Sequence, residues 1–307
     1  MNIFITGGAG FLGRHLIRRL QNEWPACQMT APSRKELDLL KPSINEQLCD
    51  IKYDYIFHLA AWTQAGDFCL YHPGEQWINN QLINTNVLRW WAEYQQAAKL
   101  VFMGTSCSYA PEYPLEESYY LEGKPIDSLY TYAHTKRMLL IGADALSKQF
   151  NLQYNCFIPS TLYGPDYHQD ERQLHFIFDL IRKICEAKKD PQKDVVLWGD
   201  GHQRREIVYI DDFLDSMISL LQIKNNEIVN IGAGSDYSIR DFAQIICDIV
   251  GYDHNMIKYD TTKYVGARSK ILDTRKLDKI LPTRSTLDIR SGLEKTIEWF
   301  VDSRLAK

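Results

Sequence analysis

Short apolar runs alternate with longer segments of helical spacing along most of the chain. The runs are rich in β-branched and aromatic residues and predict buried strands at residues 2–6, 55–60, 100–104, 154–159, 207–210 and 228–231. Between them apolar residues recur every three or four positions, which predicts helices at residues 12–20, 78–98, 131–150, 211–221 and 239–250. Strands that alternate with helices of this length are typical of βαβ units, so the pattern predicts an α/β fold with a doubly wound parallel sheet.

Beyond residue 159 the alternation becomes less regular. Residues 168–194 are polar around one predicted helix at 174–187, and residues 255–307 are charged and end in an amphipathic helix near 293–301. We expect residues 1–164, rejoined by 196–235, to form the body that contains the sheet. Residues 165–195 and 236–307 are expected to form a smaller, discontinuous C-terminal lobe against the carboxyl edge of that sheet.

Charge and cysteine content exclude several classes of function. The chain has 35 Lys and Arg against 39 Asp and Glu, with the signs mixed, which disfavours nucleic-acid binding. No apolar run reaches the about 18 residues of a membrane span, and glycines and arginines interrupt the N-terminal run, unlike a signal peptide. The seven cysteines are scattered without a C-x-x-C pair, which favours reduced thiols over disulfides or a metal site. We therefore expect a cytoplasmic protein.

A glycine-rich turn follows the first predicted strand and opens the first helix. Residues 7–13 read GGAGFLG, a G-x-x-G-x-x-G pattern. Glycines let the backbone approach a pyrophosphate, which then lies at the positive helix N-terminus, although a tight turn alone would need some of them too. The pattern predicts a Rossmann-type dinucleotide site that includes Gly7, Gly10, Phe11, Leu12 and Gly13.

The second strand region favours NADP(H) over NAD(H). An NAD site places an acidic residue about 20 residues after the glycines to hold the ribose hydroxyls. Residues 29–35 read MTAPSRK, and the first acid is Glu36. Arg14 directly follows the third glycine and Arg34 ends the strand, so two guanidiniums are available for a 2′-phosphate, unless both are solvated surface residues.

Tyr132 and Lys136 share one face of a predicted helix, because they are four positions apart. A nearby ammonium lowers the pKa of a phenol, which lets the phenol exchange a proton with a carbonyl or an alcohol. Thr105 and Ser106 follow the strand at residues 100–104, and a hydroxyl there would hold the substrate oxygen opposite Tyr132.

The chain resembles the extended short-chain dehydrogenase/reductase superfamily along essentially its whole length. The matching segments are residues 7–13, 58–61, 80–86, 132–136, 159–165 and 209–212. The resemblance implies that Thr105, Tyr132 and Lys136 form the catalytic triad, with Tyr132 as the proton donor. It also implies further cofactor contacts, at Asp38, Leu39, Leu59, Ala60, Ala61, Pro159 and Leu162. The usual dimer of the superfamily, a four-helix bundle of the fourth and fifth helices, implies a homodimer.

Within that superfamily four segments are similar to the GDP-L-fucose synthase family, the 3,5-epimerase/4-reductases of GDP-4-keto-6-deoxymannose. Residues 104–109 (GTSCSY) resemble G-S-S-C-x-Y, and residues 160–165 (STLYGP) resemble T-N-L-Y-G-P. Residues 196–199 (VLWG) with 204–206 (RRE) resemble V-V-W-G with M-R-E, and residues 270–273 (KILD) resemble K-L-L-D. The resemblance implies an NADPH-dependent enzyme that acts on a nucleotide-diphosphate sugar.

Epimerisation beside a 4-keto group needs a base to remove a proton and an acid to return one from the opposite face. The resemblance assigns the base to Cys107 and the acid to His175. If the chain stays extended after Thr105, Cys107 lies on the same side as Thr105. Alternatively, Cys107 is an inert thiol and His175 is structural. The expected substrate contacts are Ser106, Ser108, His175, Arg182, Trp198, Arg205 and Lys270. Trp198 would stack on the base of the nucleotide, unless it is a core residue. Arg205 and Lys270 would contact the diphosphate.

Four stretches depart from the family pattern around the sugar and the nucleotide. They are residues 127–132 (DSLYTY for P-T-N-E-P-Y), Thr161 for an asparagine, residues 166–169 (DYHQ for H-D-N-F) and residues 265–270 (VGARSK for D-G-T-P-R-K). The alternatives are therefore a C4 reductase or an epimerase that acts on a related nucleotide 4-keto sugar, such as a 6-deoxy-heptose. A non-catalytic NADP-sensing regulator on the same fold is a third reading.

Overall fold

A six-stranded parallel sheet forms the centre of the molecule. The computed structural model describes residues 1–42, 44, 48, 50–65, 68–170, 172–223, 225–263 and 268–305. The strand order is β10-β5-β4-β3-β1-β2. The bounds are β1 (Asn2–Thr6), β2 (Gln28–Thr30), β3 (Tyr55–His58), β4 (Lys99–Met103), β5 (Tyr154–Pro159) and β10 (Glu227–Ile231). The chain passes from β1 to one neighbour and then to the other, so the strand order reverses beside β1, where α/β sheets bind ligands. The α/β prediction is confirmed.

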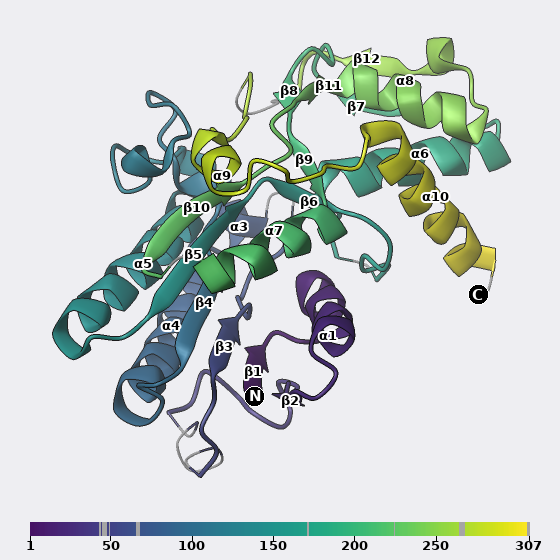
Figure 1. The fold of residues 1–307 in the computed structure, drawn as a ribbon. Coiled ribbons are helices and arrows are strands. Elements are labelled where there is room, and N and C mark those ends of the chain that lie inside the picture. Colours follow the sequence, from purple (N-terminus) through teal and green to yellow (C-terminus); the bar gives the residue numbers. More distant parts are fainter. Residues whose placement is uncertain are drawn as a thin grey trace.

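Helices cover both faces of this sheet. The helices α1 (Phe11–Glu23) and α7 (Ile210–Ile223) lie on one face, and α4 (Pro73–Tyr94) and α5 (Tyr130–Phe150) on the other (Figure 1). Because strand side chains alternate, Ile3 and Ile5 pack with α1 and α7, whereas Phe4 packs with α4 and α5. Trp90 and Trp91 are buried in the α4 side of the core. Among the described residues, no helix has both the length and the apolar character needed to cross a membrane.

The second lobe is built around three helices, α6 (Phe176–Lys189), α8 (Ile239–Val250) and α10 (Ile289–Leu305). Two small sheets complete it: β7 (Val196–Trp198) pairs with β12 (Lys258–Asp260), and β8 (Arg204–Arg205) with β11 (Tyr237–Ser238). The predicted strand near 207–210 is β9 (Ile207–Tyr209), which pairs with β6 (Thr161–Tyr163) outside the main sheet. The remaining short elements are α3 (Phe68–Tyr71), α9 (Arg275–Ile280) and 3-10 helices at residues 106–108, 117–119, 127–129 and 254–256.

The structure differs from the expected division of the chain at two points. Residues 196–205 do not return to the sheet-containing body, because β7 and β8 pair with strands of the lobe and Leu197 is in the lobe core. The segment at residues 272–280, expected in the lobe, packs on the body instead. Leu272 and Leu277 belong to the two cores that flank the main sheet, and α9 packs against β10. Apolar side chains at these two positions explain why the chain returns to the sheet there.

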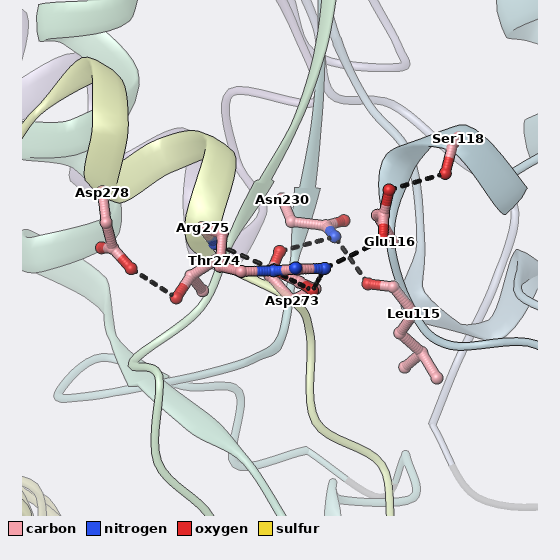
Figure 2. Close-up of polar contacts among 8 residues, drawn as sticks. All are labelled: Leu115, Glu116, Ser118, Asn230, Asp273, Thr274, Arg275 and Asp278. Atoms are coloured by element: carbon pink, nitrogen blue, oxygen red, sulfur yellow. Dashed lines mark hydrogen bonds and ion pairs between the residues drawn. The ribbon is translucent and has the colours of Figure 1, made fainter.

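Asn230 of β10 anchors this returning segment (Figure 2). It is 0% exposed, and its side-chain amide donates to the carbonyl oxygens of Leu115 (2.8 Å) and Asp273 (3.0 Å). Its amide oxygen accepts a hydrogen bond from the hydroxyl of Tyr109 at 2.7 Å. Arg275 adds an ion pair with Glu116 at 3.0 Å. One buried side chain thus joins three segments that are far apart in the sequence.

We expect Asn230→Ala to lower the free energy of unfolding by about 3 kcal/mol, because it leaves buried donors and acceptors without partners. Urea denaturation measures the change. Asn255→Ala is the matched control, since Asn255 is exposed and bonds locally to Asp253, so its effect should stay within about 0.5 kcal/mol. Equal stability of the two variants would contradict the anchoring role.

Candidate active site

The glycine-rich turn between β1 and α1 is packed too closely for side chains. A Cβ on Gly13 would lie 2.3 Å from the carbonyl oxygen of Gly7, and a Cβ on Gly7 would lie 2.8 Å from the amide nitrogen of Ala60. Gly7 also has a φ of 72°, which favours glycine. Gly10 precedes α1 without a side-chain cap, so the first N–H groups of the helix point into the turn, as an anion site requires.

A cavity of about 300 Å³ opens beside this turn. Eight predicted cofactor residues line it: Gly7, Gly10, Arg34, Asp38, Leu39, Leu59, Ala60 and Ala61. Other lining residues, including Thr6 and Trp62, carry no motif in the sequence that marks them as cofactor contacts. Thr6 holds the wall in place, since its hydroxyl accepts hydrogen bonds from the N–H groups of Leu59 and Ala60, both at 3.1 Å. Phe11, Leu12 and Gly13 begin α1, while Pro159 and Leu162 lie at the end of β5 and in β6 and do not line this cavity.

The two arginines expected at a 2′-phosphate are separated in the structure. Arg34 lines the cavity, in a turn four residues beyond the end of β2. Arg14 does not line it: its guanidinium donates to the carbonyl oxygens of Ala9 and Asp166, both at 2.5 Å. Glu36 accepts a hydrogen bond from the N–H of Ser33 at 2.8 Å and thus closes the turn that carries Arg34. The structure therefore places Arg34, but not Arg14, at the cavity, and a role for either guanidinium at a 2′-phosphate stays a prediction.

Tyr132 and Lys136 lie in the first turns of α5, and the Thr105 hydroxyl forms a hydrogen bond with the Tyr132 phenol. Burial raises the pKa of Tyr132, the Cys107 and Cys69 thiols raise it further, and the Thr105 bond opposes them. Burial lowers the pKa of Lys136 to about 8. The spacing of Tyr132 and Lys136 predicts a lowered phenol pKa, but in the structure desolvation is the largest effect and the pKa is raised. Tyr132 is consequently protonated at neutral pH.

Cys107 lies in the 3-10 helix at residues 106–108, not in an extended segment. The turn forms because the Thr105 hydroxyl accepts a hydrogen bond from the N–H of Cys107, at 3.3 Å. The ammonium of Lys270 lies 3.1 Å from the thiol sulfur. Burial raises the pKa of Cys107, but Lys270 and the Thr105 hydroxyl more than offset this, so the pKa lies below its ordinary value. The contact with Lys270 joins residues 163 positions apart, and no local pattern signals it.

His175 precedes α6 at its N-cap position. His175 is exposed as a residue, and its ring centroid lies 6.4 Å from that of Tyr167. Burial lowers its pKa, and His168 and Lys270 lower it further. Lys270 therefore acts electrostatically on both His175 and Cys107, which lie on the lobe and on the body respectively.

The other expected substrate contacts fall into two groups. Ser106 is half-buried next to Cys107, and Trp198 at the end of β7 is 57% exposed, so Trp198 is not a core residue. Ser108 and Arg182 do not fit a role in substrate binding. Ser108 is fully buried and donates to the carbonyl oxygen of Ala133 at 3.2 Å. Arg182 forms ion pairs along α6 and lines a separate, smaller cavity of the lobe.

Two placements complete the set. Arg205 lies in β8, opposite Tyr237 of β11, and donates to the carbonyl oxygen of Arg204 at 2.7 Å. Lys270, expected at the diphosphate, is at the thiol instead. Of the stretch at residues 265–270 that departs from the family pattern, residues 265–267 lie outside the described part of the chain.

Comparisons with known proteins agree with this geometry. The model of the NAD dependent epimerase/dehydratase family matches residues 3–232. The chain is 29% identical to GDP-L-colitose synthase of Yersinia pseudotuberculosis, over 99% of each protein. It is 30% identical to a putative GDP-L-fucose synthase 2 of Arabidopsis thaliana, over 99% of this chain and 93% of that protein.

Two solved structures show the same fold. The crystal structure of a GDP-L-fucose synthetase from Naegleria fowleri has a TM-score of 0.88 at 23% identity and covers 99% of this chain and 94% of that one. A GDP-6-OMe-4-keto-L-xylo-heptose reductase from C. jejuni has a TM-score of 0.88 at 22% identity and covers 98% of both chains. With the glycine turn, the Tyr132–Lys136 pair and the family match together, the chain belongs to the NAD dependent epimerase/dehydratase family.

Proposed function

We propose that the protein converts a nucleotide-linked 4-keto-6-deoxy sugar by epimerisation at C3 and C5 and reduction of the C4 ketone, with NADPH as reductant. The observation that carries this proposal is the meeting of two sets of groups. Thr105, Tyr132 and Lys136 provide the reductase chemistry, and Cys107 lies within the same hydrogen-bonded turn. The similarity to GDP-L-fucose and GDP-L-colitose synthases supports a GDP-linked sugar.

The epimerase half of the reaction uses groups on both lobes. Cys107 removes the proton from the carbon next to the ketone, and His175 returns a proton from the other face. The resting imidazole is neutral because its pKa is lowered, but a bound diphosphate would raise that pKa through its negative charge. The hydroxyl groups of Thr105 and Tyr132 stabilise the enolate oxygen.

The reductase half requires a proton for the oxygen at C4. NADPH, bound when Arg34 and the glycine turn hold its phosphates, supplies the hydride. Tyr132 donates the proton, and its raised pKa keeps it in the protonated form that this direction of reaction needs. Lys136 is one helical turn away and buried, where it orients the cofactor ribose and assists reprotonation of the phenol.

The decisive experiment is incubation with GDP-4-keto-6-deoxymannose and NADPH in D₂O, followed by cofactor absorbance and deuterium content of the sugar. NADPH oxidation with label at C3 and C5 supports the proposal, whereas label without oxidation indicates an epimerase. Oxidation without label indicates the second candidate, a C4 reductase. The likeness to GDP-mannoheptose C4 reductase from Campylobacter jejuni (TM-score 0.84) favours that candidate next. NADPH binding without either reaction, on several nucleotide 4-keto sugars, indicates a sensor.

Cys107→Ser should lower the rate of deuterium exchange at least about a hundredfold, because general base catalysis of this kind contributes about 10²–10⁴. Reduction of a substrate that is already epimerised should change far less. Mass spectrometry of the sugar and NADPH absorbance measure the two steps separately. Cys27→Ser, at a half-buried thiol near β2, is the matched control. Equal loss of both steps would exclude Cys107 as the base.

The position of Arg34 predicts the cofactor preference. Arg34→Ala should weaken NADPH binding by at least about tenfold, since a charge-assisted hydrogen bond contributes about 1.5–3 kcal/mol. NADH, which lacks the 2′-phosphate, should bind with little change. Arg14→Ala is the control, because its guanidinium is bonded to backbone carbonyls. Fluorescence titration of both cofactors measures the constants, and equal losses for NADPH and NADH would refute the assignment.

We also propose a homodimer in which α4 and α5 of two copies form a four-helix bundle. Apolar side chains are exposed on these two adjacent helices: Trp77, Ile78 and Leu82 on α4, and Met138 and Ile141 on α5. A patch of this kind is typical of subunit interfaces.

A cytoplasmic location is supported by the free thiols of Cys27, Cys69, Cys107, Cys156 and Cys247.

Ile78→Glu should convert the dimer to a monomer, because it would bury an unpaired carboxylate at the interface. Size-exclusion chromatography with light scattering measures the mass in solution. Met256→Glu, at a residue of the lobe with the same 59% exposure, should leave the dimer intact. A monomeric wild-type protein, or a dimeric Ile78→Glu variant, would rule out this interface.

A further inference from the structure

The contact between Lys270 and Cys107 has a consequence for the charge of the thiol. Lys270 donates to the sulfur at 3.1 Å, and among the described residues its ammonium forms an ion pair with no carboxylate. An ammonium at this distance favours a thiolate over a thiol, as at reactive cysteines generally. We propose that Lys270 keeps Cys107 ionised in the resting enzyme, so that Cys107 enters the reaction as a thiolate. The catalytic use of this thiolate rests on the proposed function, whereas its ionisation can be tested without any substrate.

Several other groups surround the thiol and do not supply a positive charge. The Thr105 hydroxyl interacts with Cys107, and the phenol of Tyr132 and the thiol of Cys69 lie within electrostatic range. Both of these acidic groups would oppose ionisation of Cys107 if they were charged, and burial keeps both neutral by raising their pKa. His175 has a lowered pKa, so its imidazole is neutral at rest. Lys270 consequently supplies the positive charge that stabilises the thiolate, and the Thr105 hydroxyl adds a neutral hydrogen bond.

The backbone next to Lys270 is fixed by bonds to the body. The N–H of Leu272 donates to the carboxylate of Glu206 at 2.9 Å, and the N–H of Asp273 donates to the carbonyl oxygen of Leu115 at 2.9 Å. Asn230 holds the carbonyl of Asp273 as well, at 3.0 Å (Figure 2). Because the backbone is anchored two and three residues after Lys270, the flexible lysine side chain starts from a restricted position, which lowers the entropy lost when it meets the thiolate.

The proton balance of the epimerase step follows from this charge. The thiolate of Cys107 takes the proton from the sugar carbon and becomes a neutral thiol, while the electrons of the broken C–H bond form the enolate. The negative charge thus leaves the sulfur and moves to the sugar. Lys270 is a positioning residue in this scheme, because it acts through the thiol of Cys107.

The test measures alkylation of Cys107 by iodoacetamide as a function of pH, without substrate or cofactor, by peptide mass spectrometry. In the wild type the reaction midpoint should lie below about 8.5, the value for a free thiol. Lys270→Met should raise the midpoint and slow alkylation at pH 7 by about tenfold, since one pKa unit is a factor of ten in thiolate. Lys270→Arg keeps the charge and should restore most of the reactivity, and Lys148→Met, at an exposed surface lysine, should match the wild type.

Two outcomes overturn the inference. A wild-type midpoint at or above that of a free thiol refutes it without any variant, so it stays testable even if Lys270→Met fails to fold. An unchanged midpoint in a folded Lys270→Met variant refutes it as well, and a raised KM for the nucleotide sugar would then place Lys270 at the diphosphate. The proposed function is judged by a separate result. If the wild-type protein shows a low alkylation midpoint but neither deuterium exchange nor reduction with any nucleotide 4-keto sugar, the proposed function is refuted, whereas the Lys270-stabilised thiolate is not.

Discussion

The attachment of residues 272–273 to the body is the interaction on which the site depends. Cys107 lies in the 3-10 helix that follows β4, and Tyr132 lies in the first turn of α5. Lys270 lies on the segment that leads from the lobe back to the body. Glu206 and Asn230, both buried, bind the backbone at these two positions. Their polar groups have partners on several segments, so the position of the segment is set by hydrogen-bond geometry as well as by packing. Gly232 permits this arrangement, because a Cβ there would lie 2.3 Å from the Glu206 carboxylate.

Local sequence patterns predict the elements that are long or strongly periodic. β1, β5 and α8 have the predicted bounds, and the glycine turn lies where the pattern places it. Local sequence patterns do not predict β7 and β12, because strands of three residues carry too little periodicity to be distinguished from loops. They also place residues 196–205 on the body, since no local signal shows that β7 pairs with a strand about sixty residues later.

Candidate site residues are predictable from the sequence when their role depends on neighbours in the same element, and not when it depends on contacts with distant segments. Residues that act through spacing on one element, such as Tyr132 and Lys136, are recognisable from the sequence. Asp166 lies 152 residues from Arg14 and Lys270 lies 163 residues from Cys107, so these two contacts depend on the fold. Burial changes the chemistry too: the phenol pKa of Tyr132 is raised, although the spacing to Lys136 predicts a lowered one, because desolvation disfavours the charged phenolate. Only the folded environment contains that information.

The discontinuous lobe also bears on how the chain assembles during synthesis. The described residues that line the cavity beside the glycine turn lie between Thr6 and Ile83, so they leave the ribosome before the segments of the lobe. In contrast, α6 packs against α10, which ends at Leu305, and β7 needs β12. Domains generally form as units from the N-terminal side, and contacts between distant segments form late. The nascent chain therefore contains the described residues of this cavity well before the last elements of the lobe are available to pair.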